Sequence, residues 1–184
     1  MKTIKKISHI LIFLTLSCFT SLSFSKIFYS KNEAMELAFG KDAQVEVQSL
    51  FPDKTEIAKI ETEAKVKLES GMFSFYVGKK QGKILGYAAI ESETVRTKPE
   101  TLMIVLSATG EIEKVTLLAF HEPPEYQAPD RWFELFNKKT LEELEFSKGI
   151  QGISGATLST RSALNSVRKV VAIYQVMIKN KAKK

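Results

Sequence analysis

The sequence contains very few of the side chains that most often carry catalysis. Its 184 residues include one cysteine, Cys18, and two histidines, His9 and His121. Cys18 and His9 both fall in an apolar N-terminal segment, so the rest of the chain has one histidine and no cysteine. A disulfide and an ordinary zinc site of cysteine and histidine are therefore excluded there, and we expect no metal ligands.

The common enzyme motifs are missing as well. A serine hydrolase would need His121 as its base, but the sequence has no G-x-S-x-G nucleophile elbow. It has neither a GKS or GKT phosphate loop nor a GxGxxG dinucleotide motif. We therefore assign no catalytic residue. A chain with so few reactive side chains either binds a partner passively or uses a cofactor that carries the chemistry.

The chain also lacks a strong excess of one charge. Its formal net charge is +6 at pH 7, and three of the lysines lie in the N-terminal segment. The basic C-terminal run "IKNKAKK" is typical of a solvated helix end. Aromatic residues are not interleaved with basic ones, as they are on nucleic-acid-binding surfaces. We expect no nucleic-acid partner.

Residues 1–25 have the composition of a secretory signal peptide. Three lysines form a positive start, and an apolar run follows from Ile10 to Phe24. That run is shorter than the roughly 20 residues that a membrane-spanning helix needs. We therefore predict a cleaved leader rather than a transmembrane anchor.

Small residues near Ser25 predict cleavage before Lys26, which leaves residues 26–184 as a single domain. The protein would then be periplasmic or otherwise extracytoplasmic. The alternative comes from the sequence "LTLSC", which resembles a lipoprotein box and would place a lipid anchor on Cys18.

The domain is predicted to be an α+β fold, an antiparallel β-meander or half-barrel packed with helices. Four runs rich in β-branched and aromatic residues follow one another, and Gly82 and Gly110 mark tight turns between three of them. The four runs are "MFSFYVG", "KILGYAAIESETV", "TLMIVLS" and "IEKVTLLAF". Helices are predicted at about 31–39, after Asp53, after Asp130 and at about 158–180, and a further strand at about 44–50.

The sequence "GISGATLST" precedes the last predicted helix. Gly155 and Ala156 keep bulk away from the backbone, so a ligand can approach the N–H groups of the first helical turn. Those groups and the helix dipole favour an anion such as a phosphate, which the hydroxyls of Thr157 and Ser159 and the guanidinium of Arg161 could also contact. The simpler alternative is an ordinary helix cap with a solvated Arg161, since Ser, Thr and Gly are common before helices.

This motif, followed by an amphipathic C-terminal helix, resembles the FMN-binding domain family. The family includes components of the sodium-translocating NADH:quinone reductase and of the Rnf electron-transport complex, and free-standing exported proteins. The resemblance covers about residues 70–180. It implies that FMN is esterified through its phosphate to Thr157 by a dedicated flavin transferase. It also implies that Ser154, Gly155, Ala156, Leu158 and Ser159 line the phosphate and ribityl end.

The resemblance further implies that the loop "HEPPEYQAPDRWF", with Glu122, lies close to the flavin. Tyr126 or Trp132 could stack on the ring, although we expect Trp132 to pack in the core. The implied function is an exported electron carrier, with a membrane or envelope redox partner, rather than a self-contained enzyme.

The chain departs from the family pattern in two places. Gln151 stands where the family usually has Asp, and Glu122-Pro123-Pro124-Glu125 stands where the family has a Glu-Thr-Pro-Gly type sequence. A non-covalent FMN-binding module is therefore the second hypothesis. The third is a cofactor-free interaction domain at the envelope, which would use the "EPPEYQ" loop as its contact.

Overall fold

The computed structural model describes residues 26–181. The predicted signal peptide, the residues before its cleavage site and Cys18 lie outside the described residues. No helix within the described range is long and apolar enough to cross a membrane.

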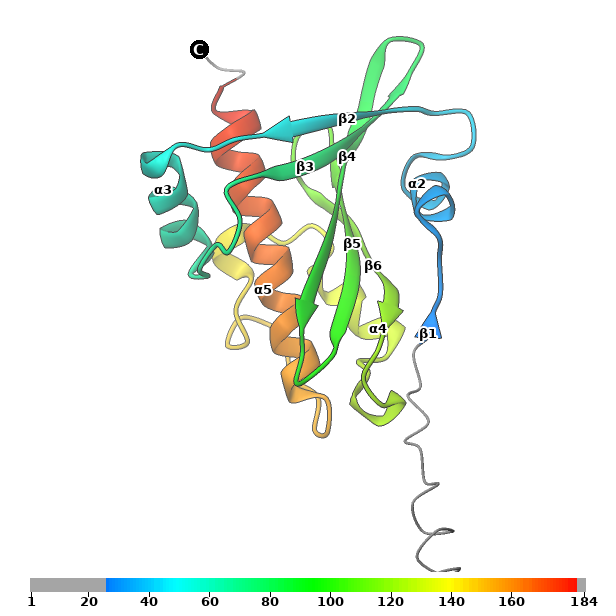
Figure 1. The fold of residues 1–184 in the computed structure, drawn as a ribbon, viewed down its shortest axis with the longest axis vertical. Helices are drawn as coiled ribbons and strands as arrows, with labels where there is room; N and C mark the ends of the chain where they lie inside the picture. The colour runs from blue at the N-terminus through cyan, green and yellow to red at the C-terminus, as the bar shows by residue number, and fades with distance from the viewer. Residues whose placement is uncertain (1–25, 182–184) are drawn as a thin grey trace, which may run out of the picture.

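A six-stranded antiparallel sheet in the order β1-β6-β5-β4-β3-β2 forms the centre of the fold (Figure 1). The four-strand meander predicted from the sequence is confirmed, and the tight turns fall at Gly82 and Gly110, which both have positive φ. The pairing of β1 with β6 was not predicted, because β1 is only two residues long. The strands are β1 (Lys26–Ile27), β2 (Gln44–Leu50), β3 (Phe73–Lys80), β4 (Lys83–Thr94), β5 (Pro99–Ser107) and β6 (Ile112–Phe120).

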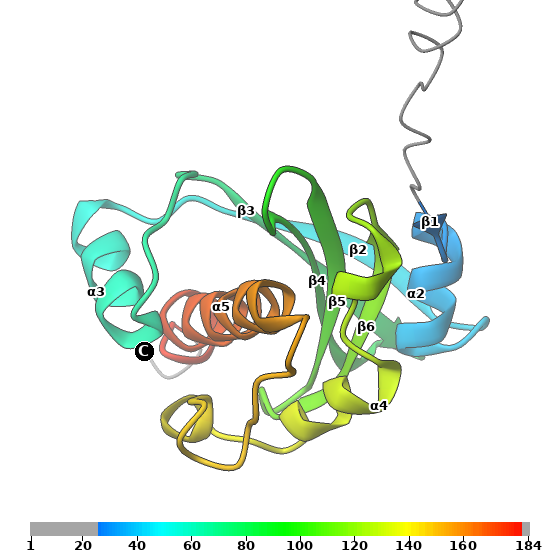
Figure 2. The ribbon, with the colours of Figure 1, turned by 90° about the horizontal axis from the view of Figure 1, so that it is seen from below.

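The sheet curves around one long helix, α5 (Thr157–Tyr174), which lies against its concave face (Figure 2). A π-helical turn, Gln175–Lys179, continues α5, so the prediction of a helix over about 158–180 is confirmed apart from that last turn. The buried face of α5 packs on large apolar side chains of the sheet, among them Phe75, Ile104 and Leu106. Burial of this face supplies most of the driving force for the fold.

Two shorter helices flank this core, and both were predicted. Helix α2 (Lys31–Phe39) covers part of the outer face of the sheet, and α3 (Lys54–Ala64) packs beside α5. Both begin with a capping box, from Ser30 and from Asp53. In each box the side chain of the cap residue accepts a hydrogen bond from the main-chain N–H of the glutamate three residues on. The side chain of that glutamate accepts a hydrogen bond from the main-chain N–H of the cap residue.

Short helical turns fill the segment between β6 and α5. Helix α4 (Asp130–Phe133) continues as a 3-10 turn, Glu134–Phe136. The helix predicted after Asp130 begins at Asp130 itself, so Asp130 does not cap it, and Pro129 occupies the cap position without a side-chain bond. The segment "TLEELEF" contains a 3-10 turn, Leu141–Glu143.

Candidate functional site

Thr157 is the first residue of α5, at the end of the loop formed by residues 149–156. Its Oγ1 donates a hydrogen bond of 3.2 Å to the main-chain oxygen of Ile153 and remains exposed. Of the two alternatives for this stretch, the ordinary helix cap is not what forms, because neither Thr157 nor Ser159 caps α5. Ser159 Oγ instead donates to the main-chain oxygen of Tyr126 at 2.5 Å, and no side chain of the described residues caps α5. The first N–H groups therefore keep their affinity for an acceptor from outside the helix.

The backbone before Thr157 makes a turn that only glycine adopts without strain. Gly155 has φ +87°, and a Cβ built there would come no closer than 4.0 Å to any atom, the main-chain oxygen of Glu125. The Ala156 N–H closes the turn by donating to Ile153 O at 3.0 Å. The turn thus leaves open space beside the helix N-terminus, as a site for a phosphate requires.

A cavity of about 250 Å³ adjoins the motif. Arg96 lies in its wall, with its guanidinium 4.5 Å from the centre of the Tyr126 ring, a cation–π contact. Arg96 was missed from the sequence, because it sits in a turn far from the motif in the chain. The lining residues are Val95, Arg96, Tyr126, Gly155, Ala156, Thr157, Leu158 and Ser159.

Glu122 fixes the turn that carries Arg96. Its side chain is 4% exposed, and Oε1 accepts the main-chain N–H groups of Arg96 (3.1 Å), Thr97 (2.6 Å) and Lys98 (2.9 Å). These hydrogen bonds, led by that from Thr97, hold the pKa of Glu122 below its ordinary value. Glu122 is not among the residues that line the cavity, so its contribution to the site is to position Arg96.

A larger cavity, of about 630 Å³, opens where β3 and β4 separate. The pairing of these strands ends at Tyr76 and Ala88, while β4 continues beside β5 to Thr94. Figure 1 shows β2 and β3 crossing sideways, while the antiparallel pair β4 and β5 extends further towards the bottom of the view. Residues from α5 line the cavity through this gap, namely Leu158, Arg161, Ser162, Asn165 and Lys169. Leu158 lines both cavities, so they flank the first turn of α5.

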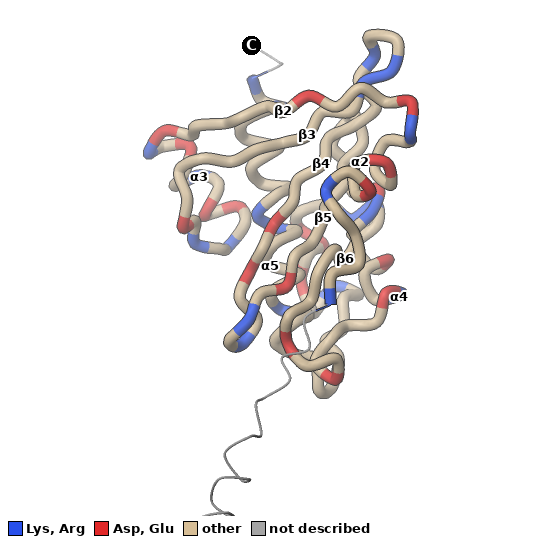
Figure 3. The backbone as a smooth tube through the Cα atoms, turned by 45° about the vertical axis from the view of Figure 1, so that its right-hand side comes forward, with Lys and Arg blue, Asp and Glu red and all other residues tan. Residues whose placement is uncertain are grey.

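Charged side chains make up part of the larger cavity's wall. Lys169 pairs with Glu91 at 2.6 Å and also with Glu93. Burial alone would lower the pKa of Lys169, but the two carboxylates outweigh it and raise the pKa. Figure 3 shows acidic positions along the lower half of β4 and basic ones in the turn after it.

The loop before the motif is held by Trp132. This side chain is 5% exposed, its Nε1 donates to the main-chain oxygen of Gln151 at 2.6 Å, and its ring packs edge-on against Phe133 and Phe136. The expectation that Trp132 packs in the core is confirmed. The side chain of Gln151 is exposed, while Tyr126 lies at the cavity.

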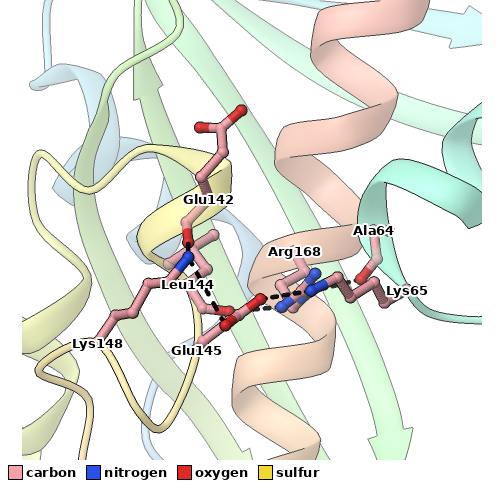
Figure 4. Close-up of polar contacts among 7 residues, drawn as sticks. All are labelled: Ala64, Lys65, Glu142, Leu144, Glu145, Lys148 and Arg168. Carbon is pink, nitrogen blue, oxygen red and sulfur yellow. Dashed lines mark hydrogen bonds and ion pairs between the residues drawn. The ribbon is translucent and has the colours of Figure 1, made fainter.

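Arg168, further along α5 than the site, ties three segments together (Figure 4). It is 6% exposed, and it donates from Nε to the main-chain oxygen of Ala64 at 2.5 Å and from Nη1 to that of Leu144 at 2.6 Å. The first oxygen belongs to the last residue of α3 and the second to the segment that leads into the 149–156 loop. Lys65 and Lys148 both pair with Glu145 at the edge of this cluster.

Within residues 26–181, no three His, Cys, Asp or Glu side chains come together in a way that could hold a metal ion. The chemistry that the geometry favours is binding of an anion at the N-terminus of α5, with a larger molecule extending into the adjoining cavity.

Comparison with known proteins agrees with this assignment. Residues 97–172 match the family model of the FMN-binding domain, which confirms the resemblance seen in the motif. The chain is also similar to a component of the Na(+)-translocating ferredoxin:NAD(+) oxidoreductase complex of Acetobacterium woodii, with 26% identity over 136 residues. That similarity covers 67% of this chain and 66% of the relative, so the chain spans about two thirds of the relative's length. The family match begins in the turn before β5 and ends within α5.

Proposed function

From the match of residues 97–172 to the FMN-binding domain, we propose that this protein is an exported electron carrier whose FMN is joined to Thr157 by a phosphoester bond. The observation that carries the proposal is the position of the Thr157 hydroxyl. It lies at an uncapped helix N-terminus, beside a cavity whose wall includes a guanidinium.

The residues around Thr157 fit the phosphate of FMN. The N–H groups and dipole of α5 favour an anion at this end of the helix. Gly155 leaves room for the phosphate beside the backbone, and Arg96 supplies a positive charge in the wall of the same cavity. Glu122 keeps that charge in place through the backbone of the turn. Arg161, one helical turn on, lines the larger cavity and adds a second cation.

The larger cavity fits the ring end of the same molecule. Its volume of about 630 Å³ falls within the range of about 300–1,000 Å³ that is usual for small-molecule sites. Tyr76, Ile90 and Leu158 give it apolar wall area, and Ser162 and Asn165 give it polar groups. Leu158 borders both cavities, so a molecule attached at Thr157 can reach the larger one along the first turn of α5.

Bound FMN supplies the redox chemistry, and the protein supplies binding, orientation and local charge. An ester bond suits a protein outside the cytoplasm, where a dissociated cofactor would be lost by diffusion. The relative from Acetobacterium woodii is named as part of a ferredoxin:NAD(+) oxidoreductase complex. By analogy we propose a membrane or envelope redox partner for this chain, attachment of FMN by a flavin transferase, and export after cleavage near Ser25 or anchoring at Cys18.

Intact mass of the protein purified from a host with the transferase tests the ester bond. The expected mass is that of the processed chain plus one FMN minus one water, and Thr157→Ala should abolish the increment. Ser159→Ala is the matched control, because it removes a hydroxyl that is already bound to Tyr126 O. Retention of the increment in Thr157→Ala would overturn the assignment. The same spectrum gives the mature N-terminus and so decides between cleavage and lipidation.

A non-covalent FMN module is the second candidate, and the exposed side chain of Gln151 favours it. That side chain stands where the family usually has an acid and is open to an enzyme approaching the loop. This candidate predicts yellow protein that releases its flavin on denaturation. Gln151→Asp should then convert binding into covalent attachment when the transferase is present. Colourless protein from the same host would instead favour a cofactor-free interaction domain.

A further inference from the structure

Glu100 is a buried acid directly behind the wall of the larger cavity. It lies near the start of β5, its side chain is 2% exposed, and Oε1 has no hydrogen-bond partner among the described residues. An unpartnered carboxyl in the interior is costly to ionise, and such groups are uncommon unless they have a function. The flavin-holding residues described above make no use of it.

The groups around Glu100 link it to the cavity. On β4, Glu93 lies directly opposite in the register, so both side chains are on the face that α5 covers. From α5, Ser162 faces Glu100, and Ser162 Oγ also lacks a hydrogen-bond partner of good geometry in the described range. Glu93 and Ser162 both line the cavity, so one layer of side chains separates it from Glu100.

The charge that acts on Glu100 is the negative one of Glu93. On α5, Lys169 is paired with Glu91 and Glu93. On β6, the residue opposite Glu100 is the apolar Phe120.

The protonation of Glu100 follows from these surroundings. Burial, with a further contribution from the charge of Glu93 and a partial offset from the Ser162 hydroxyl, raises the pKa of Glu100 to about 8. The carboxyl is therefore mostly neutral at pH 7 and ionised in mildly alkaline solution. A new negative charge in the cavity would stabilise the protonated form further, because two charges interact strongly across a layer of low dielectric.

We propose that Glu100 couples electron transfer to proton uptake in mildly alkaline solution, where its carboxyl is ionised and binds a proton when an electron enters the larger cavity. The inference rests on the proposed function, since it needs a redox group in that cavity. The electron comes from the redox partner, and the proton comes from solvent and forms one O–H bond on the Glu100 carboxylate. On reoxidation the electron leaves and the same O–H bond breaks, so the net charge around the cavity is unchanged through the cycle.

The midpoint potential of the FMN-loaded protein, measured against pH, tests the coupling. In the wild type, the midpoint potential should fall more steeply with pH above about pH 8 than the flavin alone requires, and this extra steepness is the additional slope. Glu100→Gln, which stays neutral, should lose this additional slope and keep the slopes that belong to the flavin itself. Glu113→Gln is the matched control, because it makes the same change at an exposed position on β6 and should leave the curve unchanged.

Two further variants should move the onset of the additional slope in opposite directions. Glu93→Gln removes the like charge beside Glu100 and should move the onset to lower pH. Ser162→Ala removes the hydroxyl that favours the ionised form and should move it to higher pH. A merely structural role for Glu100 would produce neither shift.

Infrared titration of the flavin-free protein gives a readout that does not depend on the cofactor. A protonated-carboxyl C=O band should disappear in mildly alkaline solution, and this band should be missing from Glu100→Gln.

The outcomes separate the coupling from the proposed function. If both proteins carry flavin and the potential depends on pH in the same way in the wild type and Glu100→Gln, only the coupling is overturned. Protein that takes up no flavin under transferase co-expression would overturn the proposed function, and the coupling with it. Should Glu100→Gln fail to fold, the opposite shifts of the Glu93 and Ser162 variants decide the question.

Discussion

The indole of Trp132 holds the main chain of Gln151 through a hydrogen bond of 2.6 Å from Nε1 to the carbonyl oxygen. Gln151 is the position at which this chain departs from the family motif, and its side chain is exposed. The departure therefore leaves the packing of the loop intact, because the loop is held by the backbone of residue 151. What changes is the chemical group that the loop presents outward.

Trp132→Phe should loosen the loop that leads to Thr157. The variant keeps an aromatic ring in the core but loses the only N–H that the side chain can donate. Loss of one such hydrogen bond costs about 1 kcal/mol in the free energy of unfolding, and the smaller ring adds to this loss. Urea unfolding should show the loss, and intact mass should show a lower flavin occupancy. Leu135→Ala, at an exposed position of the same segment, should change occupancy little. Equal occupancy in Trp132→Phe and the wild type would argue against a role for the bond.

Gly155→Ala should impair flavin attachment through the backbone alone. Gly155 has φ +87°, and a methyl group there would meet no atom closer than 4.0 Å. The cost is therefore conformational strain of about 1–2 kcal/mol, and the turn should relax to a geometry that suits the phosphate less well. Gly152→Ala is the matched control, because that glycine has no positive φ and has equal space. Intact mass should show reduced occupancy only for Gly155→Ala, and equal loss in both variants would contradict the explanation.

Much of the fold could be read from the sequence, for identifiable reasons. The four central strands alternate or run apolar between glycine turns, and both capping boxes stand in the sequence as Ser or Asp with Glu three residues later. The motif itself was readable because its residues are contiguous. These signals depend on residues that are close together in the sequence, and the structure has the predicted elements at these positions.

The parts of the site that lie outside the motif could not be predicted from the sequence. Arg96 reaches the motif only because the turn after β4 folds back against Tyr126. The larger cavity exists because the pairing of β3 with β4 ends at Tyr76, a matter of where two strands diverge. The burial of Glu100 depends on α5 covering that face of the sheet, and the sequence around it looks like an ordinary strand end.

Glu122→Gln should destabilise the protein in a pH-dependent way. The carboxylate accepts three main-chain N–H groups, which hold its folded-state pKa below the ordinary value. A lowered folded-state pKa means that the stabilisation is present above the unfolded pKa of about 4.3 and is lost as the pH falls through the folded value. The variant should lose about 1–2 kcal/mol in the free energy of unfolding at pH 7, since hydrogen bonds to a charged acceptor are the stronger ones.

The measurement is urea unfolding of the wild type and Glu122→Gln at pH 7 and at successively lower pH. The free energies of unfolding of the two proteins should converge at low pH, as the wild-type carboxyl becomes protonated. Glu125→Gln, in the exposed part of the same loop, should match the wild type throughout. A constant difference between Glu122→Gln and the wild type at all pH values would show that the charge of the carboxylate is irrelevant.

Arg168→Met should be the most destabilising of these changes. Methionine keeps the aliphatic packing of the side chain but leaves the main-chain oxygens of Ala64 and Leu144 without their donors in the interior. Each hydrogen bond from a charged donor contributes about 1.5–3 kcal/mol, so we expect a loss of more than about 2 kcal/mol in urea unfolding. Lys148→Met is the matched control, because its ion pair with Glu145 and its hydrogen bond to Glu142 O are at a partly exposed position and should contribute less than about 1 kcal/mol. Since Arg168 anchors the segment that leads into the 149–156 loop, flavin occupancy should fall in Arg168→Met and not in the control. A variant as stable as the wild type would mean that α3 and this segment hold their places without Arg168.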